Sequence, residues 1–214
     1  MAAKPKNLPA VLARLRKQYP DARYELNFET PLQLLVATIL AAQCTDERVN
    51  EVTSDLFVKY PDARSYADAP PERLEQDVHP TGFFRKKAAR IREVCRALVE
   101  RFGGRVPDTM EEMLTLPGVA RKTANVVLNM AFHKPTGVIV DSHCARVSHR
   151  LGLVRNTRPE KIELELMEIV PKEDWIFFGP AMVLHGRYVC TARKPNCAGC
   201  VLADVCPKND LDEE

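Results

Sequence analysis

Four cysteines near the end of the chain have the residue type and the spacing of a metal centre. They run C-x6-C-x2-C-x5-C, from Cys190 through Cys197 and Cys200 to Cys206. A [4Fe–4S] cluster requires four thiolates that converge on one small cube, and Pro207 repeats the Cys-Pro ending of bacterial ferredoxin runs. Structural zinc sites usually bring two close C-x2-C pairs, whereas this run has one. The spacing therefore favours a cluster over zinc.

Two other uses of these thiols fit the chain less well. Disulfides are disfavoured because no secretory signal precedes the chain and its seven cysteines cannot all pair. Four unrelated buried thiols would rarely gather in one short loop that contains Pro, Gly and Lys. We expect Cys44, Cys95 and Cys144 to play no part in the cluster. A cluster alone suggests electron transfer, so other motifs must define the function.

A second motif, LPGVARKTANVVL at residues 116–128, predicts two helices joined by a Pro-Gly turn. The turn would expose backbone N–H groups at the start of the second helix. Such groups, with the helix dipole, bind a phosphate without reading sequence. An ordinary helical hairpin is the alternative, but the sequence Arg121-Lys122-Thr123 directly after the turn makes that alternative less attractive.

The two helices of this hairpin have recognisable ends. Thr109 and Glu112 have the spacing of a capping box, so the first helix should span 109–115. Gly118 can take the positive φ of a tight turn. The second helix should begin near Ala120, and its packed face at helical spacing comprises Ala124, Val127, Leu128 and Ala131.

The positioning elements read as helices throughout, so we predict an all-α fold. The first apolar face comprises Leu8, Val11, Leu12 and Leu15. Thr30-Pro31 should cap a helix over 32–42 that is apolar nearly all round and hence buried. Further helices should begin at Thr45, span 84–102 up to Gly103-Gly104, and span 159–170. Residues 136–140 look extended but short.

Composition limits the class of protein. The 214 residues are 45% hydrophobic and 28% charged, which allows one large or two small globular domains. No apolar run reaches the ~18 residues of a membrane span, and nothing resembles a secretory N-terminus, so we expect a cytoplasmic protein. The net charge of +2 does not by itself predict binding to a polyanion. Residues 81–105 are strongly basic, although a solvated helix face explains that stretch equally well.

Together these motifs resemble endonuclease III, the iron–sulfur DNA glycosylase and abasic-site lyase family with a helix-hairpin-helix motif. The resemblance covers nearly the whole chain and also includes 140–143 (VDSH) and 184–188 (LHGRY). It implies two helical lobes with damaged duplex DNA between them. One lobe would be a six-helix lobe over 22–134, with the helix-hairpin-helix at 109–132. The other would join 1–21 to 135–214 and carry the cluster.

By this resemblance Lys122 is the nucleophile and Asp141 the catalytic carboxylate. An amine attacks carbon only when neutral, and the positive end of a helix dipole disfavours an ammonium in the first turn. Partial burial and the neighbouring Arg121 would act in the same direction. Without the resemblance, a phosphate-binding lysine is the alternative reading of Lys122, and the less favoured one. Asp141 could simply cap the helix that follows it, and the two roles are compatible.

The resemblance also assigns contacts with DNA. Gln43 and Phe83 would fill the gap that an extruded base leaves, by amide pairing and by ring insertion. A Phe after a turn is more often core. His143 would orient groups in the site or lie on a helix surface. Further contacts are assigned to the backbone at Gly118 and Ala120, to Arg121, and to Arg193 and Lys194 between the first two cluster ligands. Ala120 departs from the family pattern, which usually has glycine there.

The implied enzyme flips a damaged pyrimidine out of the duplex, excises it through a lysine Schiff base and nicks the strand 3′ to the site by β-elimination. We expect a monomer with no membrane partner. An adenine mismatch glycosylase of the same superfamily is the nearest rival, but it lacks a lysine at the position of Lys122 and carries a further C-terminal domain. A non-catalytic iron–sulfur DNA-binding or electron-transfer protein is the rival from another class.

Overall fold

The structure is a computed structural model that describes residues 5–209, and its regular secondary structure there is entirely helical. The chain divides into two compact units, which are considered separately. Unit one comprises residues 1–24 and 135–214, and unit two comprises residues 25–134. The all-α prediction is confirmed, and 136–140 is extended without forming a strand. Within the described residues, no helix combines the length and the apolar character that crossing a membrane requires.

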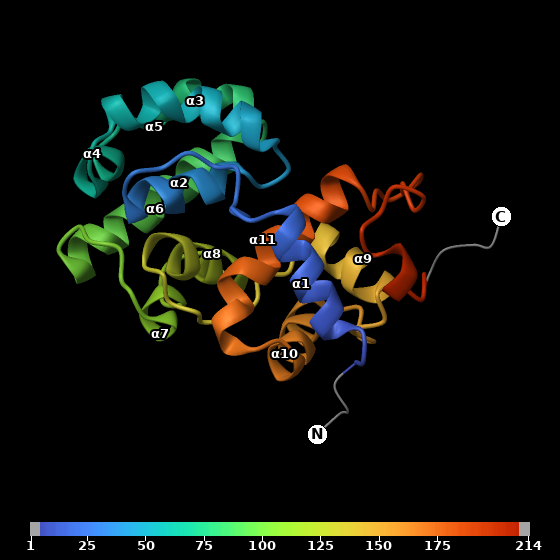
Figure 1. The fold of residues 1–214 in the computed structure, drawn as a ribbon. Helices are drawn as coiled ribbons and strands as arrows, with labels where there is room; N and C mark the ends of the chain where they lie inside the picture. Colours follow the sequence, from blue (N-terminus) through green and yellow to red (C-terminus); the bar gives the residue numbers. More distant parts are fainter. Residues whose placement is uncertain (1–4, 210–214) are drawn as a thin grey trace. The chain divides into compact units, whose positions relative to one another are not determined.

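Unit one is built around α11 (Trp175–Tyr188), which packs on α9 (Ser142–Arg150) and α1 (Leu8–Gln18) (Figure 1). Its other helices are α10 (Pro159–Ile169) and the short 3-10 turns η2 (Lys172–Asp174) and η3 (Ala203–Val205). The predicted apolar face of α1 is confirmed, since Leu8, Val11, Leu12 and Leu15 are all buried in this core.

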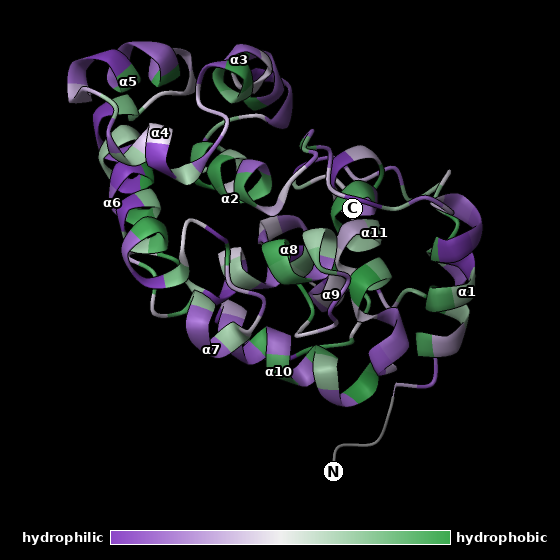
Figure 2. Ribbon diagram, turned by 90° about the vertical axis from the view of Figure 1, so that its left-hand side faces the viewer, coloured by the Kyte–Doolittle hydropathy of each residue, from purple (hydrophilic) through white to green (hydrophobic). Residues whose placement is uncertain are grey.

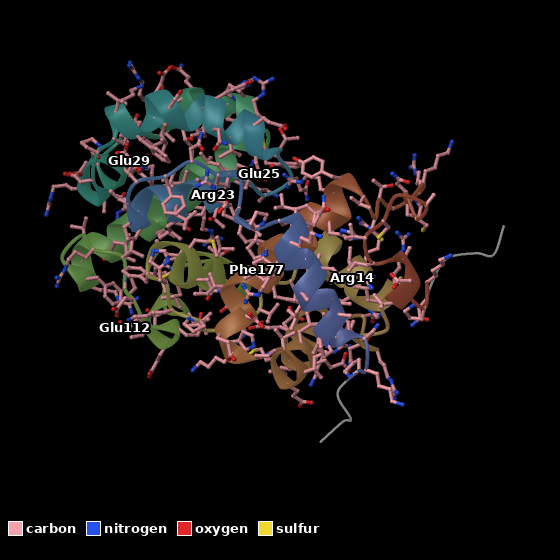
Figure 3. The ribbon with its side chains drawn as sticks, viewed as in Figure 1. Arg14, Arg23, Glu25, Glu29, Glu112 and Phe177 are labelled. Atoms are coloured by element: carbon pink, nitrogen blue, oxygen red, sulfur yellow. The ribbon has the colours of Figure 1, made fainter. Side chains whose placement is uncertain are left out.

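The close packing in unit one depends on small residues of α11. Gly179 lies against the backbone of Ile139, and a Cβ there would meet the Ile139 carbonyl oxygen at 3.1 Å. Gly186 faces α9, and a Cβ there would meet the Cβ of His143 at 2.9 Å. Next to α1, Phe177 stacks under the Arg16 guanidinium at 4.6 Å from its ring centroid. Figure 3 labels Phe177 on α11 and Arg14 on α1.

Unit two contains α2 (Pro31–Leu40), α3 (Asp46–Lys59), α4 (Ala63–Ala67), α5 (Pro71–Val78), the turn η1 (His79–Thr81), α6 (Phe84–Phe102), α7 (Met110–Met113) and α8 (Arg121–Ala131). Helix α6 packs on α4 and α5, and α2 packs on α8. Helix α6 has the length predicted for it, with one hydrophobic and one hydrophilic side (Figure 2). The predicted cap of α2 is confirmed, because Thr30 forms a reciprocal capping box with Gln33.

Two helix boundaries in unit two differ from prediction. Helix α7 is a single turn, shorter than the predicted 109–115. Thr109 does cap it, accepting from the Glu112 amide at 3.3 Å, and its hydroxyl donates to the Glu112 carboxylate (labelled in Figure 3) at 2.9 Å. Helix α2 ends at Leu40, so 41–43 form a separate turn. Both differences lie at helix ends, where weak terminal hydrogen bonds leave the sequence pattern ambiguous.

Candidate functional site

The hairpin turn between α7 and α8 carries the first group of predicted site residues. The side chains of Leu116 and Val119, on either side of Gly118, are buried and hold the turn against the core of unit two. Gly118 has φ +64°, as predicted, and a Cβ there would lie 2.3 Å from the Arg90 guanidinium carbon. The turn is also tied to α6, because Arg101 donates to the Thr115 carbonyl and hydroxyl oxygens at 3.2 and 2.8 Å.

The prediction that the second helix begins near Ala120 is confirmed, since α8 starts at Arg121. Ala120 is the N-cap of α8, with an extended backbone at φ −85° and ψ 166°, and its side chain offers no capping oxygen. Because this conformation suits any residue, the family's glycine is not needed for the backbone geometry. Its methyl group is exposed. Arg121 and Lys122 follow in the first turn of α8, where amide N–H groups have no partner within the helix.

Lys122 is exposed on this first turn. It lies at the positive end of the α8 dipole, next to Arg121, which is half-buried. Lys122 thus presents its side chain to solvent four residues after Gly118.

Asp141 is the N-cap of α9 in unit one. Its Oδ1 accepts a hydrogen bond from the Cys144 amide at 2.8 Å, so the capping role predicted from sequence is present. The preceding residues Val138, Ile139 and Val140 are buried and fix the start of the helix. Among the described residues Oδ2 has no hydrogen-bond partner. One carboxylate oxygen is thus committed to structure while the other can act on a substrate.

His143 lies on the first turn of α9 and is half-buried. Its Nδ1 is 3.2 Å from a guanidinium nitrogen of Arg146. Arg146 in turn donates to the carbonyl oxygens of Gly186 and Cys190, at 2.7 and 3.1 Å. His143 therefore belongs to the contacts that join α9 to the end of α11, and of its two predicted alternatives a positioning role fits better than a free surface histidine.

The four predicted ligands, Cys190, Cys197, Cys200 and Cys206, are all half-buried and line one pocket of unit one. None of the four forms a disulfide. Within the described residues no group of three or more His, Cys, Asp or Glu side chains is arranged to hold a single metal ion. Burial raises the pKa values of Cys200 and Cys206. A cationic centre in the pocket would offset that cost of forming thiolates.

Hydrogen-bond donors point at these sulfur atoms. Amides of Leu202 and Lys208 donate to the sulfurs of Cys200 and Cys206, each at 3.4 Å, and Arg150 donates to that of Cys190 at 3.3 Å. Such donors stabilise sulfur that carries negative charge. The residues present therefore fit a [4Fe–4S] cluster, which the four cysteines would hold.

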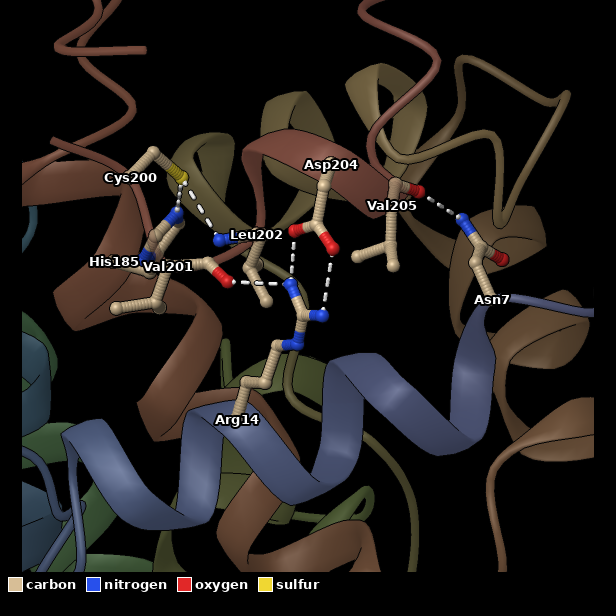
Figure 4. Close-up of polar contacts among 8 residues, drawn as sticks. All are labelled: Asn7, Arg14, His185, Cys200, Val201, Leu202, Asp204 and Val205. Carbon is tan, nitrogen blue, oxygen red and sulfur yellow. Dashed lines mark hydrogen bonds and ion pairs between the residues drawn. The ribbon is translucent and has the colours of Figure 1, made fainter. Parts of the chain in front are cut away.

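His185 adds a buried contact with the same site. Its Nε2 lies 3.4 Å from the Cys200 sulfur, as Figure 4 shows, and its Nδ1 lies 3.3 Å from the Tyr19 hydroxyl. Burial lowers the pKa of His185 to about 4, so the ring is neutral near pH 7. A neutral imidazole has one donor and one acceptor nitrogen, which matches these two contacts.

The cluster loop is held by side chains from distant parts of unit one. Arg14 of α1 pairs with Asp204 and donates to the Val201 carbonyl at 2.8 Å (Figure 4). Asn7 donates to the Val205 carbonyl at 3.1 Å, and Arg150 donates to Thr191 at 2.7 Å. Arg193 and Lys194 stay exposed on the stretch between the first two cysteines.

The predicted gap-filling residues Gln43 and Phe83 lie at the tips of two turns in unit two. Gln43 is exposed and follows the end of α2. Phe83 is 61% exposed, so the alternative that it belongs to the core is wrong. Both have left-handed backbones, at φ +53° and +48°, which non-glycine residues rarely adopt.

Comparisons with known proteins place these features in one class. Residues 36–172 match the family model of the HhH-GPD superfamily of base excision DNA repair proteins, and residues 190–206 match that of the iron-sulfur binding domain of endonuclease III. Endonuclease III of a Synechocystis strain is 54% identical, with 97% of this chain and 94% of the relative covered. Endonuclease III of Escherichia coli K12 is 39% identical, with 92% of each covered.

A solved structure of a trapped endonuclease III–DNA covalent intermediate has a TM-score of 0.91 and 41% identity, with 97% of each chain covered. The fold and motifs thus define a helix-hairpin-helix DNA repair protein that carries a [4Fe–4S] cluster. The chain belongs to the endonuclease III family, and it is a bifunctional DNA glycosylase and abasic-site lyase of base excision repair whose partner is DNA.

Gly118→Ala should weaken binding to damaged and undamaged DNA alike. Alanine at a left-handed position costs about 1–2 kcal/mol, and its Cβ would displace Arg90. Equilibrium binding to both duplexes measures the effect. Gly104→Ala is the matched control, because Gly104 has φ +80° with open space around it. Ala120→Gly should leave affinity equal or tighter, and a silent Gly118→Ala would contradict the proposed phosphate contact.

The purified protein should be brown and contain iron and acid-labile sulfide in about equal amounts. Cys200→Ala should lose much of the visible absorbance, since one of four ligands is gone. Cys44→Ala, which changes a half-exposed thiol outside unit one, should keep it. Zinc without sulfide in the wild-type protein would contradict the assignment of the cysteines.

Proposed function

We propose that this enzyme removes oxidised pyrimidines from duplex DNA through Lys122 and Asp141. The observation that carries the proposal is the placement of Lys122, exposed one residue inside α8 and directly behind the tight turn at Gly118. The turn and the start of α8 bind backbone phosphate, and this contact sets the register of the lysine on the strand. In base excision by this family, the corresponding chemistry is nucleophilic attack by a lysine on the sugar of the damaged nucleotide.

The neutral Lys122 amine attacks C1′ of the damaged nucleotide. The Nζ–C1′ bond forms as the bond from C1′ to the base nitrogen breaks, and the base leaves with the bonding electrons and takes up a proton. Opening of the sugar ring gives a Schiff base. Loss of a proton from C2′ then expels the 3′ phosphate oxygen, which nicks the strand by β-elimination.

Asp141 is proposed to act through the oxygen that does not cap α9. A carboxylate near the sugar stabilises the positive charge that develops as the glycosidic bond breaks, and it can accept a proton from the lysine ammonium. Its capping bond to Cys144 holds the side chain in one orientation. The capping and catalytic roles therefore support one another.

The remaining contacts with DNA are proposed from exposure and charge. Gln43 and Phe83 fill the gap left by the extruded nucleotide, and Arg193 and Lys194 contact phosphates beside the cluster loop. Cys190, Cys197, Cys200 and Cys206 would hold the cluster, whose part would be to order this loop and not to react with DNA. The enzyme is proposed to act as a monomer in the cytoplasm, associated with the nucleoid through DNA.

Lys122→Gln should abolish the covalent intermediate. Borohydride added during reaction with abasic-site DNA reduces the Schiff base and leaves a stable protein–DNA adduct, which gel electrophoresis resolves. Lys134→Gln is the control, since Lys134 lies just beyond the other end of α8 and pairs with Asp108. If Lys122→Gln traps as much DNA as the wild-type protein, another amine is the nucleophile.

Asp141→Asn should separate chemistry from capping. The amide retains an oxygen that caps α9, so the free energy of unfolding should fall by less than about 1 kcal/mol. Single-turnover base excision should fall by about two orders of magnitude or more, as expected when a general acid–base group is lost. DNA affinity should persist. Near-normal excision in this variant would leave Asp141 with the capping role alone.

A further inference from the structure

Gln43 and Phe83 are held in conformations that do not favour stability. A left-handed backbone is unfavourable for a non-glycine residue and persists only where its surroundings impose it. Phe83 in addition exposes most of an aromatic ring to solvent. The two tips are connected to the ends of helices by only two or three residues, so whatever fixes those helix ends also fixes the tips.

Lys87 joins those two helix ends. It lies in the first turn of α6 and is only 5% exposed. Its Nζ donates to the carbonyl oxygen of Leu40, the last residue of α2, and to that of Thr81, the last residue of η1, both at 2.7 Å. Leu40 precedes Gln43 by three residues, and Thr81 precedes Phe83 by two.

The charge of Lys87 has no carboxylate partner among the described residues, although burial disfavours it and lowers its pKa. A buried ammonium costs free energy that its hydrogen bonds must offset, and apolar residues of similar size often stabilise a core equally well. A lysine here is thus poorly explained by packing. An apolar residue could not donate hydrogen bonds to the Leu40 and Thr81 carbonyl oxygens, and so could not fix the distance between these two chain segments.

We propose that Lys87 is a positioning residue that holds Gln43 and Phe83 ready to fill the gap left by an extruded base. The inference rests on the gap-filling roles proposed above. If the turns that carry Gln43 and Phe83 are already ordered, DNA binding does not have to offset the conformational entropy of ordering them. A small displacement of a group that must enter the base stack also lowers the reaction rate. Lys87 itself does not contact DNA in this scheme, because it is buried.

The test compares two substrates that differ only in the need for gap filling. One carries an oxidised pyrimidine paired with a purine in duplex DNA, and the other carries the same lesion in a single-nucleotide bulge with no opposing base. Lys87→Met keeps the side-chain length and removes the donor. Single-turnover excision from the paired duplex should fall about 10- to 100-fold, the loss that a misplaced group causes, while excision from the bulge should change less than about threefold.

Matched variants separate positioning from general damage. Lys161→Met makes the same change on an exposed turn of α10 and should excise the lesion normally from both substrates. Phe83→Ala should show the same split between substrates, and adding Lys87→Met to it should cause little further loss, because residues that act as a unit are not additive. Lys87→Arg, which keeps the charge and several donors, should recover part of the rate.

The outcomes distinguish this inference from the proposed function. Equal losses on both substrates, no loss on the paired duplex, or full additivity with Phe83→Ala would overturn the role of Lys87. So would silent Gln43→Ala and Phe83→Ala variants. Failure of the wild-type protein to excise either lesion would instead refute the proposed function. If circular dichroism shows that Lys87→Met does not fold, Lys87→Gln replaces it in the same comparison.

Discussion

Unpaired backbone groups at helix ends organise the functional parts of both units. Each helix leaves N–H groups free at its start and carbonyl groups free at its end, and burial makes those groups costly. At the start of α8 no side chain of the N-cap residue caps the helix and Lys122 lies in its first turn, whereas at the start of α9 the Asp141 carboxylate accepts a hydrogen bond from the Cys144 amide. At the ends of α2 and η1 the carbonyls are taken by Lys87. The residues assigned to chemistry are therefore placed by the same interactions that terminate the helices.

In the cluster loop, too, backbone carbonyl groups form hydrogen bonds with side chains from other parts of the unit. Only the short turn η3 is helical between α11 and the last cysteine, and the loop's own backbone hydrogen bonds, such as that from the Cys200 amide to the Cys197 carbonyl, leave other carbonyl groups to side chains. Side chains from other parts of unit one donate to its carbonyl groups: Arg14 from α1, Asn7 from the N-cap of α1, and Arg150 from α9. Its amides turn toward sulfur, and His185 adds a ring nitrogen beside Cys200. A cluster in this pocket would bond to sulfurs that the protein has already surrounded with donors.

The local signals in the sequence predicted most of the helices and the ligand set. Apolar spacing located α1 and α6, and Thr30 marked the start of α2, because capping and burial act within a few residues. What the sequence did not predict depends on contacts between distant segments, such as Arg14 with the cluster loop or Arg90 against Gly118. The start of α8 was predicted only to within a residue, because Ala120 has no side-chain oxygen that would mark it as the N-cap. The exposure of Phe83 required the structure, since a Phe after a turn is usually buried.

Lys87 illustrates how a buried positioning lysine can be recognised in the sequence of another protein. It falls at helical spacing with Ile91, Val94 and Leu98, all buried, so the apolar stripe of α6 carries a charge at its first turn. Within a strongly basic stretch that charge looks like one more solvated lysine. Its register on the helix separates it from its neighbours Arg85 and Lys86, which are exposed. A buried charged residue in an otherwise apolar stripe must form hydrogen bonds with polar groups. Near the start of a helix, the nearest such groups are the unpaired carbonyl oxygens at the C-terminal ends of neighbouring helices.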